Sequence, residues 1–296
     1  MGSMGLKSQV CLCFLLLLTT VQGYKPVIVL HGILDKASDM KDLAGFIRSA
    51  HPGTNITIVD MFSELKSFEP LWRQVRGISP KLRPIMEQAK DGVHMIGFSQ
   101  GGITLRGIIE TMPDHNVDTF IALSSPLMGQ YGDTSYLNPF IPYKLRKDAY
   151  EFFYSRIAQD TLAIANYWND PYHQKLNMEY NIFLPFINNN QSSAWINETA
   201  YKQQKANFLK LKNLVLIGGP DDGVITPWQS SHFGFYDQDL NVLDMTQQMV
   251  YLDDTFGLQT LDKRKAVHMY TFPGIEHVKW HGSEQVFDKA IKPWLT

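Results

Sequence analysis

The sequence predicts an α/β fold in which helices alternate with the strands of a mostly parallel sheet. Short apolar runs of strand type recur along the chain, and segments with helical spacing of apolar residues lie between them. A Gly-x-Ser-x-Gly turn stands directly between one such strand and one such helix, at residues 97–101. A long aromatic-rich segment later interrupts the alternation. These observations predict βαβ units with right-handed crossovers and a helical cap inserted into them.

The first 23 residues are typical of a signal peptide. Lys7 supplies positive charge, and the apolar core from Val10 to Leu18 is shorter than the roughly 20 residues that span a bilayer. Both cysteines, Cys11 and Cys13, lie inside this leader. The mature chain would therefore have no thiol, which excludes a cysteine nucleophile and a Cys-ligated zinc site.

Composition and charge set further limits on the function. The 296-residue chain is 44% hydrophobic and has a net charge of -2, so we expect no general attraction to nucleic acid or anionic membranes. No stretch after the leader is apolar enough to span a membrane. Sequons at Asn55, Asn190 and Asn197 are candidate glycosylation sites and agree with a secretory route. The polar stretch 188–193, which contains the second sequon, is expected to be exposed.

The first third of the mature chain supplies two strands and two helical segments. The first strand falls within Tyr24 to Leu30, and residues 31–35 follow it as a loop. We expect a helix over Ser38 to Ala50 and a strand over Asn55 to Asp60. The segment from Leu71 to Lys90 should be helical only in part, with interruptions near Pro80 and Pro84, because proline lacks the backbone N–H group.

The middle of the chain contains the Ser99 turn. The strand that starts at Val93 enters the turn, and the helix after it ends near Met112. Val117 to Leu123 is the next strand. Ser124 and Ser125 follow it at the edge of the sheet where open parallel sheets bind ligands, so they could line a site. We favour the simpler interpretation, in which they are turn and capping residues.

The βα alternation stops between about residues 129 and 210. This segment holds 17 of the chain's 36 aromatic residues, including Tyr150, Phe152, Phe153, Tyr154, Tyr167, Trp168, Phe183, Phe186 and Trp195. We interpret it as a helical cap over the site. Its aromatic side chains either form the core of the cap or line a groove for an apolar substrate, and core packing is favoured for most of them.

The sheet resumes after the cap. A strand is predicted over Leu214 to Ile217, followed by the loop 218–228, and a last strand over Ala266 to Phe272. The chain closes with a helix from Ser283 to Leu295, for which Ser283 is a suitable N-cap.

The Gly-x-Ser-x-Gly turn between a strand and a helix predicts a nucleophile elbow and hence an α/β-hydrolase. Serine needs a general base, which is best a histidine oriented by a carboxylate, and this fold places them in the order Ser, Asp, His along the chain. Ser99 is the predicted nucleophile. Asp221 and Asp222 are both candidates for the acid, although both could be mere turn formers, and Asp222 is preferred. For the base, His277 is favoured over His281 because it directly follows the last strand.

An oxyanion hole can be predicted from the same fold. The N–H groups of Gln100 and Ile33 are expected to bind the oxyanion, because they follow the nucleophile and the first central strand. We expect His31 to hold its loop structurally. This chemistry requires no metal and no organic cofactor.

Several motifs resemble the palmitoyl-protein thioesterases, and most closely the second branch of that family. They extend over almost the whole mature chain and include residues 24–32, 99–102, 123–126, 128–133 and 216–231. The resemblance implies an α/β-hydrolase fold, lysosomal residence and hydrolysis of long-chain fatty acyl thioesters. It assigns the triad to Ser99, Asp222 and His277. It favours acyl-CoA and similar compact thioesters over S-palmitoylated protein.

One departure and two alternatives accompany this resemblance. Lysosomal relatives commonly carry cysteines in the cap and near the C-terminus, and this chain has none there. A secreted lipase or oxygen-ester esterase would use the same triad. A catalytically inactive hydrolase fold could instead serve as a lipid-binding module, although the complete set of triad residues argues against it.

Overall fold

The computed structural model describes residues 23–132, 149–190, 192–194 and 198–296. The predicted signal peptide lies outside the described residues apart from Gly23, as do Trp195 and the sequon asparagine Asn197. Of the other two sequons, Asn55 is exposed and Asn190 is half-buried.

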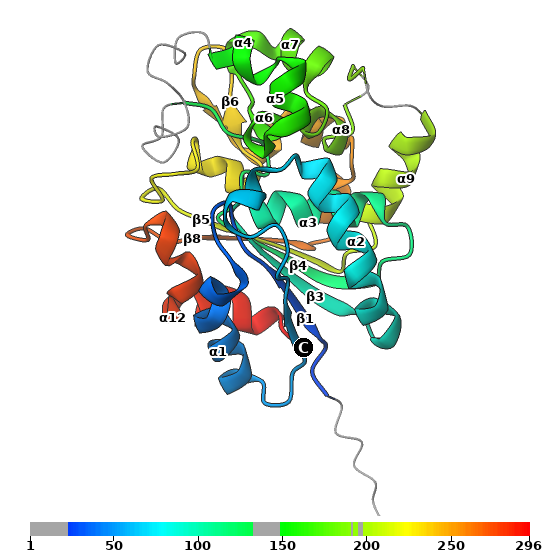
Figure 1. Ribbon diagram of the computed structural model, residues 1–296, viewed down its shortest axis with the longest axis vertical. Coiled ribbons are helices and arrows are strands. Elements are labelled where there is room, and N and C mark those ends of the chain that lie inside the picture. The colour runs from blue at the N-terminus through cyan, green and yellow to red at the C-terminus, as the bar shows by residue number, and fades with distance from the viewer. Residues whose placement is uncertain (1–22, 133–148, 191, 195–197) are drawn as a thin grey trace, which may run out of the picture.

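Six parallel strands form the central sheet, in the order β2-β1-β3-β4-β5-β8 (Figure 1). Their order along the chain and their parallel pairing agree with the sequence prediction, and their bounds differ from it by only a few residues. The strands are β1 (Val27–Leu30), β2 (Ile56–Ile58), β3 (Val93–Phe98), β4 (Val117–Leu123), β5 (Asn213–Gly218) and β8 (Val267–Thr271).

The two faces of the sheet are covered by separate sets of helices. In β5, Leu214 and Leu216 belong to one hydrophobic cluster, whereas Val215 and Ile217 belong to the other. The first cluster includes residues of α2 (Leu71–Gln88) and α3 (Gln100–Thr111), and the second includes residues of α1 (Lys41–Ala50) and α12 (Glu284–Val286). Figure 1 shows α1 and α12 together on the face opposite α2 and α3. Burial on both faces explains the continuous apolar runs of inner strands such as β1 and β5.

The helix α2 runs without a break from Leu71 to Gln88, so the predicted interruptions at Pro80 and Pro84 are wrong. Both prolines are exposed, and each removes only one N–H group from the helix. The buried face of α2, which includes Ile78 and Leu82, packs against the main core. Packing of this face therefore outweighs the local cost of the prolines.

The segment between β4 and β5 is helical wherever it forms regular elements in the described residues (Figure 1). Phe153, Tyr154, Trp168 and Phe183 are buried in the main cluster, which confirms core packing as the principal role of the aromatic side chains. The helices are α4 (Ala149–Phe153), α5 (Arg156–Thr161), α6 (Ala163–Tyr167), α7 (Gln174–Tyr180), α8 (Leu184–Ile187) and α9 (Glu198–Phe208).

The polar stretch after α8 is largely buried, so the prediction that residues 188–193 are exposed is wrong for Asn188, Asn189 and Ser193. The side-chain amide of Asn189 donates to the carbonyl groups of Tyr201 and Thr255. Asn189 is buried here because its amide group satisfies carbonyl groups of two segments that are distant along the chain, Tyr201 in α9 and Thr255 after α10.

The last part of the chain adds elements that the sequence analysis leaves unassigned. They are β6 (Phe235–Tyr236), β7 (Val242–Leu243), α10 (Met249–Leu252) and α11 (Leu258–Lys263). The predicted C-terminal helix is present in three short pieces, namely α12, a π-helical turn over Phe287–Ile291 and a 3-10 turn over Lys292–Trp294. The hydroxyl group of Ser283 accepts the Val286 N–H and caps α12 as predicted.

The two ends of the described chain meet at the amino end of the sheet. The backbone N–H of Lys25 donates to the Thr296 carbonyl at 2.9 Å, and the Thr296 N–H donates to His94 Nε2 at 3.1 Å. His94 lies near the start of β3, whereas Ser99 follows its last residue. The termini and the predicted site therefore lie at opposite ends of the strands.

Candidate active site

Ser99 lies in the sharp turn between β3 and α3. Its backbone has φ 52° and ψ −127°, a conformation that costs free energy and that side chains rarely adopt. A Cβ atom added at Gly101 would lie 2.4 Å from the carbonyl oxygen of Leu30, and one added at Gly97 would lie 2.4 Å from the Gly102 Cα. Glycine is therefore required on both sides of Ser99, as the elbow pattern predicts.

His277 bridges Ser99 and Asp222. It begins the 3-10 turn His277–Gly282, a few residues after β8. Its Nε2 lies 2.9 Å from the Ser99 Oγ, and its Nδ1 lies 2.8 Å from Asp222 Oδ2 and 3.0 Å from Oδ1. Ser99, Asp222 and His277 are each no more than 6% exposed. In this arrangement Nδ1–H donates to the carboxylate and Nε2 accepts from the hydroxyl group.

The two adjacent aspartates have different roles. Asp222 Oδ1 accepts the N–H groups of Val224 at 3.0 Å and Ile225 at 2.7 Å, and the His277 N–H donates to the Asp222 carbonyl at 2.9 Å. Asp221 instead accepts the Gly274 N–H at 2.7 Å and caps the neighbouring turn. Of the two candidates, only Asp222 meets the imidazole of His277.

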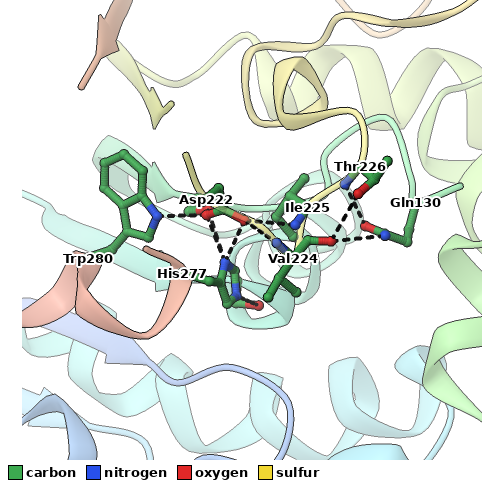
Figure 2. A network of polar contacts seen from close by, with 9 residues as sticks. Gln130, Asp222, Val224, Ile225, Thr226, His277 and Trp280 are labelled. Carbon is green, nitrogen blue, oxygen red and sulfur yellow. Dashed lines mark hydrogen bonds and ion pairs between the residues drawn. The ribbon is translucent and has the colours of Figure 1, made fainter. Parts of the chain in front are cut away.

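Two further side chains reach the Asp222 carboxylate. Trp280 Nε1 donates to Oδ2 at 2.7 Å, so that Trp280 and His277 approach Asp222 from different sides (Figure 2). The Ser124 hydroxyl group donates to the same oxygen at 2.5 Å and lies 3.3 Å from His277 Nδ1. The preferred interpretation of Ser124 as a turn and capping residue is therefore wrong, because the end of β4 brings its side chain into the site.

Hydrogen bonds keep Asp222 ionised despite its burial. Burial alone would raise the pKa of Asp222, but the hydrogen bond from His277 and its electrostatic interaction with the carboxylate, together with the bonds from Ser124 and Ile225, hold that pKa below its usual value. An ionised carboxylate is the form that can orient the imidazole and stabilise the imidazolium.

The loop that contains Asp222 is fixed by Gln130. The Gln130 side chain donates to the Val224 carbonyl at 3.1 Å and accepts the Thr226 N–H at 3.1 Å (Figure 2). Gln130 lies in the segment that follows β4, so the start of the predicted cap supports the acidic loop directly.

The two residues predicted to supply the oxyanion donors are Gln100, which follows Ser99, and Ile33, in a loop next to it. Gln100 is the first residue of α3, where N–H groups have no intrahelical acceptor, and its side chain donates to the Ser67 carbonyl at 2.7 Å. A Cβ atom added at Gly32 would lie 2.9 Å from the Ser99 Cβ, so the loop that contains Ile33 passes directly beside Ser99. His31 is buried and contacts the Gly32 carbonyl and the Ser63 hydroxyl group, in agreement with a structural role.

Residues 23–132, 149–190, 192–194 and 198–296 contain no group of three or more side chains suited to hold a metal ion. None of the helices in these ranges has the length and apolar character that crossing a membrane demands.

A separate groove of about 1380 Å³ lies between α2 and the helices that follow β4. Trp72, Val75, Ile182 and Phe186 contribute apolar surface to it, and none of the three triad residues lines it. Apolar pockets are the usual candidates for ligand sites. This groove has no paired nucleophile and base, so we place the chemistry at Ser99.

The chain is similar to known palmitoyl protein thioesterases. A family model described as palmitoyl protein thioesterase matches residues 26–277. The chain is 47% identical over 274 residues to the lysosomal thioesterase PPT2 of Homo sapiens, covering 93% of this chain and 89% of that protein. It is 50% identical to PPT2-B of Xenopus laevis over 275 residues, covering 93% of each chain. The PPT2 homolog of Drosophila melanogaster is 41% identical over 273 residues, with 92% of each chain covered.

Solved structures support the predicted fold. The crystal structure of the mature form of Bacillus licheniformis lipase BlEst2 is similar with a TM-score of 0.50 and 14% sequence identity, over 93% of this chain and 94% of that one. At this identity the likeness concerns the fold, which is that of an α/β-hydrolase.

Proposed function

The chain belongs to the palmitoyl protein thioesterase family, and from this premise we propose that it is a lysosomal serine thioesterase that hydrolyses long-chain fatty acyl thioesters. The observation that carries the assignment of the chemistry to Ser99 is its 2.9 Å contact with His277, whose other ring nitrogen contacts Asp222. A buried serine, histidine and carboxylate in this order form the arrangement that acyl transfer requires.

In the first half of the proposed reaction, Ser99 Oγ attacks the thioester carbonyl carbon while His277 Nε2 takes the hydroxyl proton. Asp222 stabilises the imidazolium that forms. The N–H groups of Gln100 and Ile33 bind the oxyanion. The C–S bond then breaks, and His277 returns the proton to the leaving thiolate to release a thiol and an acyl-enzyme.

In the second half, a water molecule attacks the acyl-enzyme. His277 accepts a proton from the water and returns it to Ser99 Oγ as the ester bond breaks. The products are a fatty acid and a regenerated serine. No step requires a group other than the residues named and water.

The proposed substrate is an acyl-CoA such as palmitoyl-CoA in preference to an S-palmitoylated protein. The resemblance of the sequence motifs to the second branch of the family supports this choice. We further propose that residues from about 129 to 210 act as the cap above Ser99, since helices α4–α9 all lie in that segment.

A paired hydrolysis assay tests the proposed function. The mature chain should cleave palmitoyl-CoA faster than a matched palmitoyl oxygen ester, and Ser99→Ala should lower the rate by a factor on the order of 10⁴–10⁶. The variant should stay folded by circular dichroism, because alanine fits wherever serine does in this turn.

Three results would change this proposal. Faster cleavage of the oxygen ester would favour a lipase or esterase. Substantial residual activity in Ser99→Ala would refute the assigned nucleophile. No hydrolysis by a folded wild-type chain would favour the lipid-binding module.

A further inference from the structure

We infer that Ser124 is a positioning residue that keeps the Asp222 carboxylate ionised and directed at His277, and so extends the activity of Ser99 into acidic solution. The inference rests on the proposed function for its substrate, but it concerns a residue that the Ser-Asp-His pattern does not include.

The first observation is the crowding of donors around one carboxylate. Asp222 Oδ2 accepts from Ser124, Trp280 and His277, while Oδ1 accepts two backbone N–H groups. The side chains of Asp222 and His277 are 1% and 7% exposed, so little water reaches them. In such a site each donor favours the ionised form of the Asp222 carboxylate, and water cannot replace a donor that is removed.

The second observation is the backbone conformation of Ser124. Its φ is 44°, in the left-handed region that residues other than glycine rarely adopt. Its N–H donates to the Ile217 carbonyl at 2.7 Å, which fixes the end of β4 to β5, the strand that leads to Asp222. The unusual backbone places the hydroxyl group between the carboxylate and the imidazole, where it contacts both.

The third observation is the contrast with the next residue. Ser125 is also fully buried, but its hydroxyl group has no hydrogen-bond partner among the described residues. Burial of a serine at this turn therefore does not by itself account for the contacts of Ser124. The pair provides a matched experiment, because both positions are serine and both become alanine.

The charged groups around Asp222 determine the direction of the expected effect. His277 faces Asp222 directly, and Asp221 is turned to the Gly274 N–H. His281, on the same 3-10 turn as His277, lies within electrostatic reach of Asp35, Asp39, Asp42 and His277. Among these groups only His277 bonds the Asp222 carboxylate. Loss of the Ser124 donor should therefore raise the pKa of Asp222 toward its ordinary value.

The decisive measurement is the pH dependence of the reaction of Ser99 with an alkyl fluorophosphonate, followed alongside palmitoyl-CoA hydrolysis. The acidic limb follows protonation of the hydrogen-bonded Asp222–His277 pair as a unit. In Ser124→Ala the acidic midpoint of both profiles should move up by about one pH unit, because the loss of a hydrogen bond to the charged carboxylate changes that protonation equilibrium about tenfold. Ser125→Ala should leave the midpoint unchanged. In an Asp222→Asn background, Ser124→Ala should cause no shift.

Several outcomes would overturn the inference. The first is a Ser124→Ala pH profile that coincides with that of the wild type. The second is a Ser124→Ala rate that is lowered by the same factor at every pH. The third is a shift of the acidic midpoint in Ser125→Ala as large as the shift in Ser124→Ala. If Ser124→Ala fails to fold, Ser124→Gly removes the hydroxyl group while tolerating the positive φ. If the wild-type chain reacts with the fluorophosphonate but does not hydrolyse palmitoyl-CoA, only the proposed function is contradicted. The pH profiles of fluorophosphonate labelling would still test the role of Ser124.

Discussion

Arg106 is a buried cation that joins helix α3 to the segment after β4. It forms an ion pair of 2.7 Å with Glu110, and both side chains are 0% exposed. Its guanidinium group also donates to the carbonyls of Leu127 and Ile187 and to Asn188 Oδ1. Nearly all of its donors are used, so the pair is well compensated in the folded state.

Removal of this cation should strongly destabilise the fold. We expect Arg106→Ala to lower the free energy of unfolding by about 3–5 kcal/mol, because it leaves Glu110 buried without its partner. Arg156→Ala is the matched control, since Arg156 pairs with Asp160 at the same helical spacing but the two side chains are 94% and 57% exposed. That change should cost no more than about 0.5 kcal/mol. Urea unfolding of both variants provides the comparison, and equal effects would contradict the prediction.

At the scale of single residues, the sequence predicts the principal groups but not their partners. Ser99, Asp222 and His277 are recognisable because each follows a strand in a fixed order. Ser124 and Trp280 are not recognisable in this way, because their bonds to Asp222 depend on the register between β4 and β5 and on one turn of 3-10 helix. Asn188 and Asn189 look like loop residues because their buried partners are distant in sequence.

Among the secondary-structure elements, the junction of β3 and α3 should tolerate the least change. A Cβ atom at Gly101 would lie 2.4–2.5 Å from the backbone oxygens of Leu30 and His31, which cannot move without displacing β1 and the loop beside Ser99. Gly101→Ala should therefore reduce both stability and hydrolysis. The α1 residue Gly45 has no atom within 4 Å of an added Cβ. Gly45→Ala should stabilise the protein by about 0.5–1 kcal/mol.

Thermal denaturation and palmitoyl-CoA hydrolysis of both variants would test this contrast. A Gly101→Ala variant with the activity and melting temperature of the wild type would show that the junction is less tightly packed than its geometry indicates. A loss of stability in Gly45→Ala would show that helix propensity does not decide the outcome at this half-buried position of α1.

At the scale of elements, the strands are predictable and the helices less so. Each buried strand is an apolar run that a parallel sheet requires on both faces, so its sequence and its environment agree. In α2 the local signal from Pro80 and Pro84 disagrees with the tertiary environment, and packing of the opposite face decides the outcome. The short strands β6 and β7 contain no such run, because only two residues of each strand pair with the other strand.

The molecule as a whole should lose stability in acid through three buried histidines. Burial lowers the pKa of His94, His115 and His232 to about 4, from an ordinary value of 6.5. Between these pH values the unfolded chain binds more protons than the folded one, so folding stability rises with pH and falls as the solution is acidified. Each histidine should contribute a slope that approaches about 1.4 kcal/mol per pH unit.

Urea unfolding at several pH values from 7 to 4 would measure this slope. His232→Asn removes one titrating group and should reduce the slope, whatever its effect on stability at neutral pH. A slope that is unchanged in this variant, or a wild-type stability independent of pH in this range, would contradict the prediction. The acid sensitivity of folding is therefore expected to come from these buried histidines, whereas the acid sensitivity of the site depends on the ionisation of Asp222.

The meeting of Lys25 and Thr296 at the amino end of the sheet has a consequence for protein engineering. Because these residues are joined by a main-chain hydrogen bond, a short peptide could connect them and make the backbone circular. New ends could then be opened in an exposed turn elsewhere, and the order of the strands in space would be preserved. If the new ends lay between Ser99 and His277, the permuted chain would carry Ser99, Asp222 and His277 in a new linear order while their arrangement in space stayed the same.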